Sequence, residues 1–142
     1  MIKINKKMEY ALMALKYFHA KQEQQGTAQN GPALISAKDL AEITHTPFDV
    51  ISRVLQALSS RGILKAEYGV SGGYFLAQDL TTLTVFDLIS VLDSSTELAK
   101  CLGSESDCEL SGKCSIVSPM THLNNKVQNF YKSISIAEVF HV

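Results

Sequence analysis

Three cysteines are the residues of this chain with the clearest potential for chemistry. Cys101, Cys108 and Cys114 lie within fourteen positions of the 142-residue sequence, in the stretch CLGSESDCELSGKC. The intervening residues show no apolar periodicity, so these side chains are not expected to fill a core. Structural zinc sites usually close with four ligands and often use Cys-x2-Cys pairs. The wider gaps here favour an iron–sulfur cluster, 2Fe–2S or 4Fe–4S, with zinc, free thiols or a disulfide as alternatives.

Composition describes a folded protein of one domain, or of one small domain with an appendage. Hydrophobic residues make up 46% of the chain and charged residues 19%. No stretch approaches the roughly 18 consecutive apolar residues that a membrane span needs. The N-terminal residues lack the apolar core and cleavage site of a signal peptide. We therefore expect a soluble cytoplasmic protein, in a compartment where disulfides are uncommon.

Charge is distributed unevenly along the chain. Residues 1–70 carry nine Lys and Arg against six Asp and Glu, whereas residues 71–142 carry four against eight. A polyanion such as DNA would therefore meet the first half more favourably than the second.

Four capping patterns predict where helices begin. In the pattern Ser/Thr-x-x-Asp/Glu, the hydroxyl and the acid each accept a bond from a backbone N–H at the helix start. It occurs at Ser36/Asp39, Thr46/Asp49, Thr84/Asp87 and Ser135/Glu138. Pro47 suits a first helical position, and Gly62 suits a left-handed helix end. The expected helices cover residues 6–21, 37–43, 47–61 and 85–92, and two short strands within 63–77 flank a glycine-rich turn at 69–73.

The C-terminal part contains an apolar seam. Its positions are spaced by four and three residues in alternation, which is a heptad pattern. They are Ile116, Met120, Leu123, Val127, Phe130 and Ile134. A helix of about twenty residues with such a seam packs either on its own domain or on a second copy of the chain. We favour the second copy, which predicts a homodimer.

A short helix, a tight turn, a longer helix and a hairpin follow each other in the order of a winged helix-turn-helix. The longer helix would enter the major groove of DNA with its outward face, which carries Asp49, Ser52, Arg53 and Gln56. Arg53 can pair with guanine and Gln56 with adenine. Thr46 and Ser52 are candidates for phosphate contacts at the helix start.

Basic side chains around this motif are further candidates for phosphate contacts. They are Lys3, Lys6, Lys7, Lys38, Arg61 and Lys65. The turn GVSGG, with Ser71 and Gly72, would form the tip of the wing near the minor groove. On an ordinary exposed surface, each of these side chains would simply be solvated.

These elements together are similar to a known family. The chain resembles the iron–sulfur winged-helix regulators of the IscR/NsrR family over nearly its whole length. The resemblance is carried by KINKKMEYALMAL, DLAEITHTPFDVISRVLQALSSRGIL, GVSGGYFLA, TVFDLISVLD and the three-cysteine segment before a long helix. It implies a homodimeric transcription regulator whose DNA affinity responds to oxidants, nitric oxide or iron through its cluster. It also implies that Cys101, Cys108 and Cys114 are thiolate ligands.

The fourth ligand is where this sequence departs from part of the family. IscR-type members place a histidine three residues after the last cysteine, and here that position is Val117. His122 could serve only if the loop folds back. Members that sense nitric oxide use an acid near the start of the first helix, supplied by the partner subunit, and the matching residue is Glu9. We favour Glu9. A first-turn acid is also common for helix-dipole reasons alone.

The wing departs from the family as well. Several relatives carry an arginine just before the wing glycines, whereas this chain has Tyr68 there. Minor-groove contact would then be left to Lys65 or to the backbone.

The sequence thus predicts a mainly α-helical protein with a small β-hairpin wing. Residues 1–80 would form the winged helix-turn-helix domain, and residues 81–142 would carry the cluster loop, at about 95–115, and the dimerisation helix. Double-stranded DNA and a second copy are the expected partners, without a membrane or a small-molecule substrate. A DNA-binding regulator with zinc or no metal and a small iron–sulfur electron carrier are the alternatives. No pair of residues is spaced for catalysis, so an enzyme is not expected.

Overall fold

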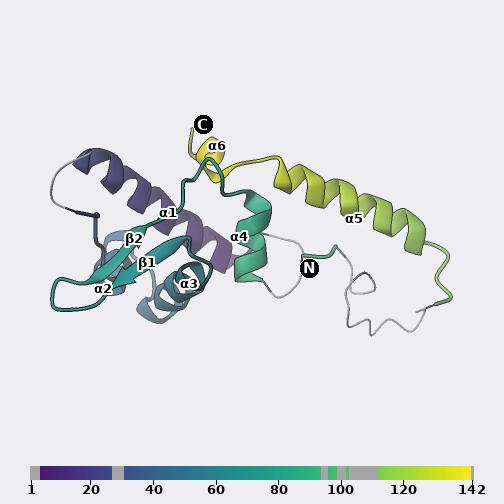
Figure 1. The fold of residues 1–142 in the computed structure, drawn as a ribbon. Helices are drawn as coiled ribbons and strands as arrows, with labels where there is room; N and C mark the ends of the chain where they lie inside the picture. Colours follow the sequence, from purple (N-terminus) through teal and green to yellow (C-terminus); the bar gives the residue numbers. More distant parts are fainter. Residues whose placement is uncertain (1–3, 27–30, 94–95, 99–101, 103–111, 142) are drawn as a thin grey trace. The chain divides into compact units, whose positions relative to one another are not determined.

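The computed structural model describes residues 4–26, 31–93, 96–98, 102 and 112–141 (Figure 1). Cys101, Cys108 and Lys3, and most of the predicted cluster loop, lie outside the described residues. The chain forms two compact units, one of Asn5–Asp79 and one that contains Ile4 and the described residues from Leu80 onward. In the part of the chain that the structure describes, no helix is long and apolar enough to cross a membrane.

The first unit begins with α1, Lys6–Gln25. Asn5 caps it, with its side-chain oxygen accepting a bond from the Met8 N–H at 3.0 Å. The buried face of the helix recurs at helical spacing and includes Leu15 and Phe18. The helix runs four residues beyond the predicted end at 21, because Gln and Glu are good helix formers.

The helix-turn-helix follows as α2, Ala37–Thr44, and α3, Phe48–Ser60. Both helices contact α1, and the fully buried side chains of Leu40, Ile51 and Leu55 lie in this core. After α3, Gly62 has a φ of 76°, so the predicted left-handed helix end is confirmed. The Ile63 N–H then donates to the Leu58 carbonyl at 3.1 Å. This bond lies directly before the first strand.

The hairpin consists of β1, Leu64–Glu67, and β2, Gly73–Leu76, paired antiparallel with Leu64 opposite Leu76 (Figure 1). A further bridge joins Tyr74 to Ile35, with N–H to carbonyl distances of 2.8 and 2.9 Å. At Gly73 an added Cβ would lie 2.7 Å from the Ile35 carbonyl carbon. Glycine is therefore required where the hairpin crosses the segment before α2. The predicted class, mainly helical with a small hairpin, is confirmed.

The second unit contains α4, Val85–Leu92, α5, Val117–Lys132, and α6, Ile136–Phe140. The predicted capping box at Thr84 is complete, with both bonds at 3.1 Å. Backbone bonds join the segments before α4 and α6, from the Val85 N–H to Ile134 at 2.9 Å and from the Ile136 N–H to Leu83 at 2.8 Å. The side chains of Leu83, Leu88 and Ile136 are buried in this unit. α5 has 16 residues and is shorter than the helix of about twenty that the seam suggested.

Candidate nucleic-acid interface and cysteine segment

The turn between α2 and α3 is fixed by several hydrogen bonds. His45 adopts the left-handed conformation, with φ 55° and ψ 40°. The Thr46 N–H donates to the Ala41 carbonyl at 3.0 Å. The Thr44 hydroxyl donates to the Leu40 carbonyl at 2.7 Å and lies 2.8 Å from the Thr46 hydroxyl. These bonds set the direction in which α3 leaves α2.

The prediction that Thr46 caps α3 is wrong. Pro47 occupies the N-cap position, and no side chain accepts a bond from the first-turn N–H groups of α3. Pro47 also lies one position before the helix, not in its first helical position. The hydroxyl of Thr46 is instead bonded to Thr44, a partner that the tight turn brings close. The start of α3 therefore has no side-chain cap of its own.

One face of α3 is buried, and the opposite face is exposed to solvent. Ile51, Val54, Leu55 and Leu58 are buried and hold the helix on the core. Asp49, Arg53 and Gln56 are exposed, and Ser52 is half-buried. The exposed residues recur every three or four positions, so they share one face of the helix. The structure thus brings the predicted base-reading residues together on a solvent-facing surface.

Phe48, the first residue of α3, was not among the predicted site residues, although its side chain is 52% exposed. Phe48 lies three positions before Ile51 and seven before Leu55, at helical spacing with the buried residues, so no sequence signal marks its side chain as exposed.

The predicted phosphate-contacting cations of the first unit are all exposed. They are Lys6, Lys7, Lys38, Arg61 and Lys65. Lys6 already has a partner, because its Nζ lies 2.8 Å from Glu9 Oε2. The hydrogen bond that Lys6 donates to Glu9, together with the negative charge of Glu9, raises the pKa of Lys6.

The tip of the hairpin carries the predicted wing residues. Ser71 is exposed and Gly72 half-buried, and the Gly72 N–H donates to the Gly69 carbonyl at 3.1 Å. Tyr68 and Val70 beside them are almost fully exposed, at 96% and 111% of their reference areas. The wing tip therefore offers apolar and hydroxyl surface, with Lys65 as an exposed cation on β1.

The predicted metal ligands are only partly described. Cys114 is half-exposed and lies two residues before Ile116, the N-cap of α5. His122 is exposed on α5 itself, and Glu9 lies in the first turn of α1 with its side chain 43% exposed. Among the described residues, no group of three or more His, Cys, Asp or Glu is placed to hold a metal ion.

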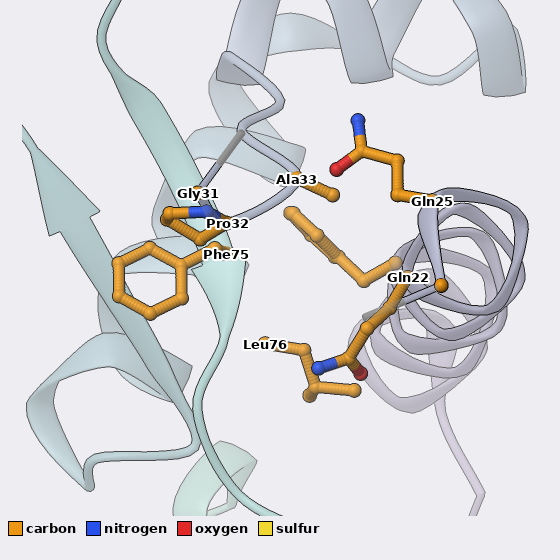
Figure 2. Close-up of a pocket in the computed structure, with 9 residues that line it drawn as sticks. Gln22, Gln25, Gly31, Pro32, Ala33, Phe75 and Leu76 are labelled. Carbon is orange, nitrogen blue, oxygen red and sulfur yellow. The ribbon is translucent and has the colours of Figure 1, made fainter. Parts of the chain in front are cut away.

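A small notch in the first unit contains none of the predicted site residues (Figure 2). It has a volume of about 220 Å³ and lies between the end of α1, residues 31–33 and β2. Phe75, Leu76 and Pro32 give it apolar walls, and Gln22 and Gln25 add amides. No charged side chain lines it, so it lacks the chemistry of a phosphate site.

Residues 4–141 match the model of the Rrf2 family, described as iron-dependent transcriptional regulators. The chain belongs to the Rrf2 family. It is therefore a DNA-binding transcription regulator and not an enzyme, and the resemblance seen in the sequence is confirmed.

Individual proteins that are similar to this Rrf2 protein are also regulators. The regulator IscR of Yersinia pestis is 24% identical over 112 residues, which cover 79% of this chain and 66% of IscR. The structure of CymR, the global cysteine regulator of B. subtilis, superposes with a TM-score of 0.65 at 21% identity and covers 98% of this chain and 96% of CymR. T. potens IscR gives a TM-score of 0.63 at 22% identity, covering 98% and 86%. The structural likeness establishes the shared winged-helix fold.

The α2–α3 turn can be tested by replacing Thr44 with valine. This change removes the bonds to Leu40 and Thr46, so we expect the free energy of unfolding to fall by about 1 kcal/mol. Thr121→Val is the matched control, because it removes a similar bond, 2.8 Å from Thr121 to Val117, on the exposed surface of α5. Its cost should stay below about 0.5 kcal/mol in urea unfolding followed by circular dichroism. Equal losses for the two variants would contradict a special role of the turn.

Proposed function

We propose that this Rrf2 regulator is a homodimer that senses redox state, nitric oxide or iron supply through an iron–sulfur cluster. The observation that carries the proposal is the set of three closely spaced cysteines, Cys101, Cys108 and Cys114, placed directly before α5. Cys114, the described member of the set, is half-exposed and outside the buried core, as expected for a ligand and not for a packing residue.

The donor set fits such a cluster. Thiolates are soft ligands that suit iron–sulfur chemistry, and loops of spaced cysteines commonly carry it. The three cysteines would supply three thiolates and leave one position for another residue. When bound, an iron–sulfur cluster supplies one-electron redox chemistry and sensitivity to oxidants.

Glu9 is our candidate for the remaining position, contributed by the partner subunit. Its carboxylate is partly exposed in the first turn of α1 and is bonded to Lys6, so binding a metal would replace that ion pair. A carboxylate is a hard ligand, and a hard ligand on iron–sulfur chemistry exchanges readily. His122, exposed on α5, is the alternative.

DNA contact is proposed for the exposed face of α3. Arg53 and Gln56 would read base edges in the major groove, with Asp49 and Ser52 beside them. Because no side chain caps α3, its first N–H groups can donate to a phosphate, with Thr46 nearby. The sequence-independent phosphate contacts would come from basic residues and from the wing. They are Lys3, Lys6, Lys7, Lys38, Arg61, Lys65, Ser71 and Gly72.

The apolar seam of α5 supports the homodimer. Ile116, Leu123 and Phe130 are 56%, 49% and 62% exposed in the single chain. A seam with heptad spacing is self-complementary, so a second copy of α5 is the occupant that its pattern fits. A two-fold dimer would present two α3 helices to half-sites about 34–36 Å apart on one face of DNA.

A second candidate is a winged-helix regulator whose cysteines hold zinc or no metal. It is favoured by the likeness to CymR, the global cysteine regulator of B. subtilis, over 98% of this chain. Iron and sulfide content distinguishes the two candidates.

The DNA proposal predicts that Arg53→Ala weakens binding to a duplex selected by the wild-type protein from random sequences. We expect a loss of about 1–3 kcal/mol and relaxed base preference at one position. Lys126→Ala is the control, because it removes an exposed positive charge on α5. In fluorescence anisotropy at fixed salt, the control should bind as the wild type does. Equal loss in both variants would indicate a contribution from net charge alone.

The dimer proposal predicts that Phe130→Glu yields a monomer, because it places a charge in the seam. Asn125→Glu adds the same charge on the opposite side of α5 and should stay dimeric. Sedimentation velocity reports the mass, and circular dichroism confirms that both variants keep their helices. A wild-type chain that sediments as a monomer at micromolar concentration would refute the dimer.

The ligand proposal predicts that Glu9→Ala loses iron and sulfide faster in air than the wild type. His122→Ala should behave as the wild type. Lys6→Ala removes the same ion pair but keeps the carboxylate, so it should also retain the cluster. The visible absorbance is followed over time after anaerobic reconstitution. Unchanged decay in Glu9→Ala would exclude it as a ligand, and faster decay in His122→Ala alone would assign the position to His122.

A further inference from the structure

Asn124 is the one buried residue of α5. Its side chain is 5% exposed, whereas Leu123 and Phe130 of the apolar seam on the same helix are 49% and 62% exposed. A polar group is buried at low cost only when its hydrogen bonds are made. The amide of Asn124 therefore needs partners that hold it in place.

Those partners lie in residues 96–98, more than twenty-five positions earlier. The Leu98 N–H donates to Asn124 Oδ1 at 2.9 Å, and Asn124 Nδ2 donates to Glu97 Oε2 at 2.6 Å. One end of the amide accepts and the other donates, so the orientation of the side chain is specified.

Gln128, one turn further along α5, reinforces the contact. Its Nε2 donates to the Thr96 carbonyl at 3.1 Å and to Glu97 Oε2 at 3.3 Å. We call Glu97, Asn124 and Gln128 the Asn124 clamp. The clamp attaches residues 96–98 to the second and third turns of α5.

The residues that the clamp attaches to α5 lie just before the cysteine segment in the chain. Leu98 lies three residues before Cys101, and Cys114 lies three residues before the first residue of α5. The clamp thus fixes the entrance of the cysteine segment to the same helix that begins at its exit.

We propose that the Asn124 clamp is a positioning device that transmits the state of the cysteine segment to α5. This inference rests on the proposed cluster at Cys101, Cys108 and Cys114. Asn124 directly follows Leu123 of the seam, and Gln128 follows Val127. The clamp and the seam are therefore carried by the same helix, so a displacement of the clamp would move the seam with it.

The first test uses the chain without metal and needs no cluster. Hydrogen exchange by NMR measures the Leu98 amide in the wild type, Asn124→Ala and Asn125→Ala. Loss of the Asn124 acceptor should speed Leu98 exchange roughly tenfold, the effect of one net hydrogen bond. Asn125→Ala, one residue away on the exposed side, should change nothing. Unchanged exchange in Asn124→Ala would refute the clamp.

Gln128→Ala is a milder second variant. It removes the bonds to Thr96 and Glu97 but keeps the Asn124 bonds. A smaller acceleration at Leu98 is expected, and it provides the test if Asn124→Ala loses helix content by circular dichroism. No acceleration in Gln128→Ala would then count against the clamp.

The second test measures transmission. After anaerobic reconstitution, wild-type α5 should exchange its backbone amides more slowly than without metal. Asn124→Ala should take up the same iron and sulfide but show no such change in α5. An equal change in Asn124→Ala would refute transmission and leave the cluster proposal intact. A wild-type chain that takes up no iron and sulfide would refute the cluster and transmission together, while the metal-free test of the clamp still stands.

Discussion

Burial of one face of α3 is the constraint on which the first unit depends. Ile51, Leu55 and Leu58 are fully buried and tie α3 to the core that it shares with α1 and α2. That burial leaves Arg53 and Gln56 exposed on the opposite face. The hydrogen-bonded turn at Thr44–Thr46 sets the start of the helix, and the hairpin is held by the Ile35–Tyr74 bridge. Because each element is fixed by apolar burial or by backbone bonds, the exposed polar side chains of α3 are not needed to hold the fold together.

The second unit holds its long helix differently. The buried contact of α5 is a polar one, through Asn124, and Lys132 lies 4.6 Å above the ring of Phe86 on α4. Such contacts are directional, so they define the position of the helix without using Leu123 or Phe130 of its apolar seam. These two side chains stay exposed for another surface. A helix held by few directional bonds is also one whose position a neighbouring segment can alter, which is the property that a sensor requires.

Local features were predictable from the sequence, and contacts distant in sequence were not. The hydroxyls of Ser36, Thr84 and Ser135 cap their helices as predicted, and at Thr84 the acid completes the pattern, because each bond involves atoms only three residues apart. The same pattern failed at Thr46, where the turn supplied Thr44 as a competing partner. The capping pattern in the sequence does not show that Thr44 would compete for the hydroxyl of Thr46.

In the candidate site, too, local features could be predicted and contacts between distant residues could not. The exposed face of α3 follows from helical periodicity, and the structure has it as predicted. The bond between Asn124 and Glu97 joins residues 27 positions apart, and an asparagine in a helix gives no sign in the sequence that it is buried. Phe48 was missed for a related reason, because nothing local marks a large apolar side chain as exposed.

The central claim is that the three cysteines bind an iron–sulfur cluster. The most direct measurement is the visible absorption spectrum of freshly purified protein under anaerobic conditions, with iron and acid-labile sulfide counted per chain. The account predicts absorption bands in the visible region with matching amounts of iron and sulfide, and their loss in Cys114→Ser. A colourless wild-type protein without sulfide, even after anaerobic reconstitution, would contradict it and leave a winged-helix regulator that senses by other means.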